Sequence, residues 1–225
     1  MSKWLVELKL RARELAQKIP YQQIRDSPSV KYYTDWNAFE KCVDPSIEEL
    51  SKYSTTMNIP YELNIASING NMSIAKVPNG VNVMSINELG DEFGKLLFKS
   101  MDISESRALA RHVANLINGV YVEVNDDLRE PLRIGVTAST PRPVLLPTHY
   151  TVLINDGVTA SLSIFIHGFG GCPSTTVEIY LGRGSRLNAL FVSTHEQVPT
   201  YSLIKVIASD DSSITARTLI MGGVP

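Results

Sequence analysis

Apolar and polar residues alternate in a pattern that occurs three times between Tyr150 and Met221. Each copy has a short alternating strand, a two-residue break built around glycine or aspartate, and a second alternating strand. The breaks are Asp156-Gly157, Arg183-Gly184 and Asp210-Asp211, so the copies lie 27 and again 27 residues apart. A period between about 20 and 50 residues is typical of solenoid proteins.

Two strands and two turns per period suit one rung of a β-helix, with rungs stacked about 4.8 Å apart. Residues one period apart then lie above one another. We therefore predict two inward ladders, one of Ala160, Leu187 and Ile214 and one of Leu162, Ala189 and Ala216. A β-sandwich also has turn signals at intervals, but it does not require the same spacing in both sets of strands. The repeat therefore favours a solenoid.

The β pattern begins after Gly119. Val120, Val122 and Val124 alternate before Asn125-Asp126-Asp127, which resembles the break thirty residues later. We interpret this as a first rung lengthened by the proline-rich loop at 141–143. The predicted organisation is a helical or mixed region over residues 1–118 and a β-helix core over 119–225, apparently incomplete at its C-terminus.

The region before residue 119 contains helical and hairpin signals. Apolar spacings of three and four predict a helix over residues 2–19 capped by Ser2, and the same signal predicts a helix over 104–117 capped by Ser104. Shorter helices are expected over 44–53 and 87–99. Asn69-Gly70 between alternating segments predicts a hairpin within 57–77, followed by a strand over 81–85. Residues 21–43 predict an ordered loop with one helical turn.

Composition and charge limit the function classes. Apolar content of 44% and charged content of 20% are ordinary for globular proteins, and a net charge of −2 gives no electrostatic reason to expect nucleic acid or membrane as a partner. No apolar run approaches the roughly 18 residues of a membrane span. The N-terminus has no signal-peptide core. Two cysteines are too few for a disulfide scaffold. These features predict a cytoplasmic protein.

Three segments resemble the SufB/SufD family, the scaffold proteins of the Suf system for iron–sulfur cluster assembly. Residues 4–12 (WLVELKLRA) resemble the N-terminal helix of that family, and residues 116–124 (LINGVYVEV) followed by Glu130-Pro131-Leu132 resemble its entry into the β-helix. Residues 177–187 (VEIYLGRGSRL) are similar to its repeated rung. The match covers most of the chain in order.

The resemblance implies a right-handed β-helix between helical ends and a non-enzymatic role. It implies a transient iron–sulfur cluster as cofactor, and the Suf ATPase and a second SufB/SufD-like chain as partners. Family members are usually longer, with more rungs and a C-terminal helical region that docks the ATPase. We therefore expect the strand over 213–221 to form an open edge that pairs with another chain or a further segment.

Cys172 is the main chemical candidate. SufB-type members carry a Glu-Gly-Cys segment that supplies a sulfur-handling thiol, and Gly171-Cys172 matches its second half but lacks the glutamate. His167 and His195 differ by 28 positions and should lie almost above one another, with Glu196 following. Thiolate, imidazole and carboxylate are reasonable ligands for iron or zinc. If Cys172 handles sulfur or iron, it should be at least partly exposed and close to His167 or His195; the alternative is a small packed residue in a glycine-rich corner. Cys42 is expected to be packed.

Two other function classes stay open. A β-helix that binds or cleaves polysaccharide normally has a secretion signal and a row of carboxylates along one face. The outward positions here are serine, threonine, asparagine and arginine, with no such row: Ser161, Ser163, Asn188, Thr215 and Arg217. A structural β-helix that polymerises through its open end is the third class.

Overall fold

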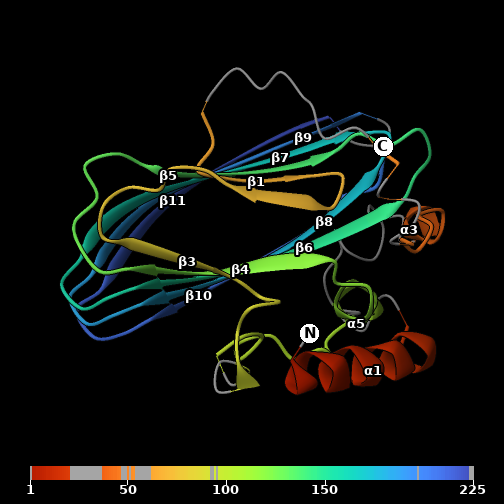
Figure 1. Ribbon diagram of the computed structural model, residues 1–225, viewed down its shortest axis with the longest axis horizontal. Coiled ribbons are helices and arrows are strands. Elements are labelled where there is room, and N and C mark those ends of the chain that lie inside the picture. Colours follow the sequence, from red (N-terminus) through yellow and green to blue (C-terminus); the bar gives the residue numbers. More distant parts are fainter. Residues whose placement is uncertain are drawn as a thin grey trace, which may run out of the picture.

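The chain folds into a β-helix of about four turns with helices beside one of its sheets (Figure 1). This computed structural model describes residues 2–20, 37–46, 50, 52–53, 62–91, 94, 96–196 and 198–222. The helices described are α1 (Lys3–Lys18), α3 (Asn37–Glu40) and α5 (Arg107–Ala114). The strands are β1 (Ile65–Ile68), β2 (Asn71–Ile74), β3 (Val81–Ser85), β4 (Asn118–Val124), β5 (Leu132–Ala138), β6 (Leu145–Ile154), β7 (Thr159–Phe169), β8 (Cys172–Leu181), β9 (Arg186–Glu196), β10 (Tyr201–Ala208) and β11 (Ser213–Gly222).

Two sheets enclose the core. One has six strands in the order β11-β9-β7-β5-β1-β2, and the other has five in the order β10-β8-β6-β4-β3. From β4 onward, successive strands alternate between the two sheets, and strands within a sheet pair in parallel. The inner faces meet in a continuous core of buried valine, isoleucine and leucine side chains. This alternation of strands is the course of a β-helix, as the 27-residue period predicts.

The strand register confirms the predicted ladders. Ala160 pairs with Leu187, which pairs with Ile214 on the next strand. In the other sheet Val152 pairs with Ile179, which pairs with Val206. Apolar residues one period apart therefore stack in both sheets, and this stacking buries a core that a single rung lacks.

The first rung is longer by three residues, and the additional residues lie where the proline-rich loop predicts. β5 pairs with β7 at an offset of 30, as Leu132 beside Leu162 shows. β6 pairs with β8 at an offset of 27, as Val152 beside Ile179 shows. The difference is taken up between β5 and β6, in the connection that contains residues 141–143. An insertion in a connection leaves the inward and outward positions unchanged.

Strands before residue 119 also belong to the solenoid. β1 and β2 form the predicted hairpin around Asn69-Gly70, whose positive φ values of 50° and 81° fit a tight two-residue turn. β1 pairs in parallel with β5, and β3 pairs antiparallel with β4. The solenoid sheets therefore include strands from Ile65 onward, whereas the sequence pattern predicts only a separate hairpin and a short strand before residue 119.

The helices α1 and α5 pack against each other beside the five-stranded sheet (Figure 1). Their apolar side chains form a second core with outward residues of that sheet, including Tyr121, Leu153 and Leu203. The five-stranded sheet is thus covered on both faces, and β8 is buried along nearly its whole length. In the six-stranded sheet, β7 alternates buried and less buried positions instead.

Helix boundaries differ from the prediction in three places. α5 is capped by Ser106, whose Oγ accepts from the Leu109 N–H, so Ser104 is two residues too early. Ser2 occupies the N-cap position of α1 but makes no side-chain capping bond. The described residues of 87–99 form turns instead of an α-helix. Most of the loop predicted over 21–43, and the centre of the helix predicted over 44–53, lie outside the described residues.

Candidate functional site

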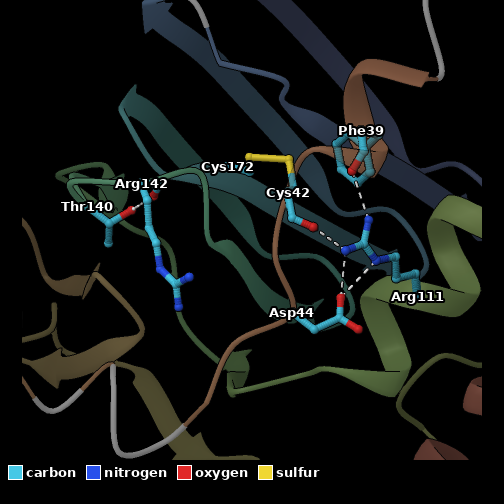
Figure 2. Close-up of a disulfide and its surroundings, with 7 residues drawn as sticks. All are labelled: Phe39, Cys42, Asp44, Arg111, Thr140, Arg142 and Cys172. Carbon is cyan, nitrogen blue, oxygen red and sulfur yellow. Dashed lines mark hydrogen bonds and ion pairs between the residues drawn. A yellow bond between two sulfur atoms is a disulfide. The ribbon is translucent and has the colours of Figure 1, made fainter.

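Cys172 is the packed residue of the alternative interpretation and not the partly exposed thiol that sulfur or iron handling requires. It begins β8, its side chain is 0% exposed, and it forms a disulfide with Cys42 (Figure 2). Cys42 is packed, as expected, but it is also covalently bonded across 130 positions of sequence. No sequence signal predicts this pairing, because it is the fold that brings residue 42 beside the start of β8.

His167 and His195 do not face each other. The period is 27, and their spacing of 28 places His195 beside Gly168 and His167 beside Thr194. A shift of one residue along a strand moves a side chain to the opposite face of the sheet. The Nδ1 of His167 lies 2.5 Å from Thr194 Oγ1, whereas the nearest polar partner of His195 is Ser193 Oγ at 3.4 Å. Burial lowers the pKa of both histidines.

The four predicted ligands do not fit a common metal ion. Cys172 is held in the disulfide, the two histidines lie on opposite faces, and Glu196 is exposed at the end of β9. Within the described ranges, no group of three or more histidine, cysteine, aspartate or glutamate side chains is arranged to hold a metal. No chemical step is therefore assigned to a metal or cluster at these residues.

Arg111 of α5 holds the chain around Cys42 (Figure 2). Its guanidinium donates to the carbonyl oxygens of Phe39, at 2.8 Å, and of Cys42. It also donates through Nε to Asp44 Oδ1 at 2.8 Å and forms an ion pair with that carboxylate. Because the guanidinium presents its donors in a fixed fork, one side chain fixes three positions: the cysteine, one residue before it and one after it.

The turn before Cys172 requires glycine. Gly170 has φ 106°, and a Cβ there would meet the carbonyl oxygen of Thr140. The adjacent Gly171 would place a Cβ 2.7 Å from Thr140 Oγ1. Both glycines, including Gly171, which the resemblance relates to a sulfur-handling segment, thus have a steric reason in the packing of this turn against the preceding rung.

A chain of buried polar side chains lies on the outer face of the five-stranded sheet, beneath α5. His112 Nδ1 is 2.7 Å from Ser174 Oγ, and His112 Nε2 is 2.9 Å from Thr176 Oγ1. Thr176 Oγ1 is also 2.8 Å from His149 Nδ1, and His149 Nε2 is 3.4 Å from Glu178 Oε2. All five side chains are fully buried.

Glu178 is satisfied as a carboxylate. Its oxygens accept from the Phe98 N–H at 2.7 Å, from the Ser100 N–H at 2.7 Å and from the Ser100 hydroxyl at 2.6 Å, and the Tyr180 hydroxyl donates at 3.2 Å. Phe98 adopts φ 56°, and its ring stacks on His149 with centroids 3.8 Å apart. A buried charge is tolerated when several donors reach it.

The Glu178 carboxylate determines which group donates and which accepts in each hydrogen bond of these buried polar side chains. Since Glu178 only accepts, His149 carries its proton on Nε2, which also lies 2.9 Å from Thr151 Oγ1, and it accepts at Nδ1 from the Thr176 hydroxyl. Thr176 then accepts from His112 Nε2–H, and His112 Nδ1 accepts from Ser174. Every member is satisfied with both imidazoles neutral, which agrees with the pKa values of both histidines, lowered by burial.

The sequence prediction found no partner for His149. Strand register gives the missing signal, because one period places Thr176 beside His149 and Glu178 beside Thr151. The solenoid period therefore predicts most of this chain once outward positions of the buried sheet are considered. His112 lies on α5 and is outside the repeat, so the period does not find it.

No family model and no curated protein matches the sequence. Among the described helices, none has both the length and the apolar character needed to cross a membrane.

Proposed function

We propose that this protein is a SufB/SufD-like scaffold component of iron–sulfur cluster assembly, which acts by binding other proteins and not as an enzyme. The observation that carries the proposal is the combination of a β-helix with an N-terminal helix α1, the architecture that the resembling segments imply. The same segments lie in corresponding places: residues 4–12 in α1, residues 118–124 in β4, and residues 177–187 across β8 and into β9.

In this proposal the iron–sulfur cluster is cargo. Cys172 is buried in a disulfide, and His167, His195 and Glu196 do not converge with it. The proposal therefore assigns no described residue as a cluster ligand. The contribution of the chain is a rigid surface on which partner proteins meet.

Exposed sheet edges support a second SufB/SufD-like chain as one partner. In the described residues, β10 and β11 are the outermost strands of their sheets, each with a single neighbour. β11 exposes Leu219, Ile220 and Met221, and β10 exposes Val206 and Ile207. Unpaired strand edges with apolar side chains are suited to pairing with another chain. The Suf ATPase is the other partner we propose.

We also propose a cytoplasmic location. In that compartment disulfides are rare, and those that form are usually transient. The Cys42–Cys172 bond would then change with the redox state of the cell.

Binding to the purified Suf ATPase tests the proposal, measured by isothermal titration calorimetry and by the mass of the complex on size-exclusion chromatography. We expect a complex of fixed stoichiometry. Ile220→Asp, on the exposed edge, should abolish pairing with a second SufB/SufD-like chain. The matched control Ser161→Asp, on the inner strand β7, should leave pairing unchanged. Absence of ATPase binding, together with binding to a polysaccharide panel, would replace the proposal by the carbohydrate-binding class.

A further inference from the structure

Residues 37–46, called here the latch segment, lie across one end of the five-stranded sheet. Between residues 38 and 46, two side chains are buried, those of Phe39 and Cys42, whereas Val43 is 41% exposed. The segment contains one turn of helix, α3. Its order therefore depends on a small number of described contacts.

Four kinds of covalent or polar contact fix the latch segment. The Cys42–Cys172 disulfide joins it covalently to β8. The Val43 N–H donates to Pro143 O at 2.7 Å, and the Leu145 N–H donates to Val43 O at 2.8 Å, which makes a short parallel bridge. The Arg111 guanidinium supplies the third contact. The fourth is the ion pair of Arg107 with Glu40, at 3.1 Å. Of these, the disulfide alone changes with redox conditions.

Apolar side chains lie beneath the segment. Phe39 and Cys42 pack with Leu145 at the start of β6, Cys172 at the start of β8 and Tyr201 at the start of β10. The Phe39 and Tyr201 rings meet edge to face with centroids 6.1 Å apart. Departure of the segment would uncover the ends of three adjacent strands.

We propose that the Cys42–Cys172 disulfide is a redox-controlled latch: a dithiol reductant opens it and releases residues 37–46 from the end of the five-stranded sheet. One thiolate of the reductant attacks a sulfur of the disulfide, and the other cysteine leaves as a thiolate. The second thiol of the reductant then displaces the first cysteine. Two electrons and two protons pass to the protein, which gains two thiols, and the reductant becomes a disulfide.

Access to the sulfur atoms is through the latch itself. Both cysteines are 0% exposed, so a reductant reaches either sulfur only when the segment lifts from the sheet. Local opening of this kind occurs in segments with few buried contacts. The rate of reduction thus reports how often the latch segment lifts from the sheet. Reduction then removes the covalent link that would bring the segment back to the sheet.

Hydrogen exchange of the full chain, followed by mass spectrometry with and without dithiothreitol, tests the proposal. On reduction, the Val43 and Leu145 amides should exchange about tenfold faster or more, because their bonds join the segment to the solenoid. The Ile179 amide in β8 is the internal control and should not change. Equal exchange at Val43 and Leu145 in both redox states would overturn the proposal and leave the disulfide a permanent structural link.

A double variant provides the second arm. Cys42→Ala with Cys172→Ala should show the fast exchange at Val43 with or without reductant. The Arg111→Lys variant, which retains the disulfide but loses the guanidinium fork, should show slow exchange until it is reduced. If the double variant does not fold by circular dichroism, the reduced wild-type chain still decides, since it needs no substitution. Slow exchange in a folded double variant would also overturn the proposal.

Discussion

At the scale of single residues, the structure concentrates its polar interactions in one place, around Glu178. A carboxylate buried at 0% exposure on a sheet face costs free energy unless donors surround it. Here donors come from Ser100, Tyr180, His149 and the Phe98 backbone, so the charge holds the turn at residues 98–100 against β8.

Glu178→Gln should lower the free energy of unfolding by about 2–4 kcal/mol. The glutamine NH₂ group would replace one carboxylate oxygen and would face the surrounding N–H and O–H donors. Urea denaturation at pH 7.5 measures the loss. The control Glu130→Gln, at an exposed connection, should change stability by less than about 0.5 kcal/mol. Equal stability of the Glu178→Gln protein would mean that the residue is not ionised in the native state.

The buried histidines make stability depend on pH. Burial lowers the pKa of His112 well below its usual value, and burial also lowers that of His149 against the opposing effect of Glu178. The unfolded chain therefore takes up protons as the pH falls through about 6.5, before the native state does. Stability should be constant above about pH 7.5 and fall below 6.5, by at most about 1.4 kcal/mol per pH unit for each histidine.

Urea denaturation between pH 8 and pH 5 measures this slope. His112→Gln should reduce the slope even though it lowers stability at pH 8, and His195→Gln, at a half-buried site, should change the slope less. A slope unaffected by His112→Gln would show that other groups titrate in this range. Near pH 4 the loss should steepen. Burial alone would raise the pKa of Glu178, but hydrogen bonds from His149 and Ser100 bring it below its usual value.

The residue scale is also where prediction from sequence was weakest. The Cys42–Cys172 pair joins a loop to a strand across 130 positions, and no spacing rule relates them. The prediction that His167 and His195 lie above one another is wrong for a narrower reason: their spacing of 28 residues differs by one from the 27-residue period. In a strand, a difference of one position changes the face.

At the scale of elements, the repeat makes strands more predictable than helices. The 27-residue spacing fixes which apolar residues face inward, so Ala160, Leu187 and Ile214 could be predicted in register. Helix ends depend on which serine makes the capping bond, and Ser104 and Ser106 are equally good caps by residue type. The early strand β1 was predicted as part of a hairpin, but its pairing with β5 depends on contacts between distant residues.

Inward and outward positions on one strand should respond differently to substitution. Ile164→Ala on β7 should destabilise the protein by about 2–5 kcal/mol, since Ile164 is 0% exposed and pairs with Ile134 and Phe191 on either side. The neighbouring Ser163→Ala should change stability by about 0.5 kcal/mol or less. Both effects are measured by urea denaturation, and similar losses at the two positions would contradict the alternation.

At the scale of the whole molecule, stability is distributed over rungs. Each rung contacts mainly the rungs above and below it, so the total is close to a sum of rung and interface contributions. The fold should accept removal of a complete rung but not of an incomplete one.

Deleting residues 183–209 removes one period and joins Gly182 to Asp210. The shortened chain should fold with the same β spectrum and a lower midpoint of urea denaturation, because β11 then takes the place of β9 beside β7. Deleting residues 183–210 shortens the turn by one residue and should cost much more, because the inward positions of β11 no longer align. Circular dichroism and urea denaturation compare the two, and equal stability would contradict the register.

In the part of the chain that the structure describes, the helices cover one sheet only, and this has a consequence for how the sequence can change. Outward positions of the five-stranded sheet meet α1 and α5, whereas outward positions of β7 and β9, such as Ser161 and Asn188, lie on a face that no described helix covers. Substitutions should therefore accumulate on the outward face of the six-stranded sheet and be rejected on the outward face of the five-stranded sheet. New binding properties can arise on the six-stranded side without loss of the fold, so that side is where related chains should diverge first.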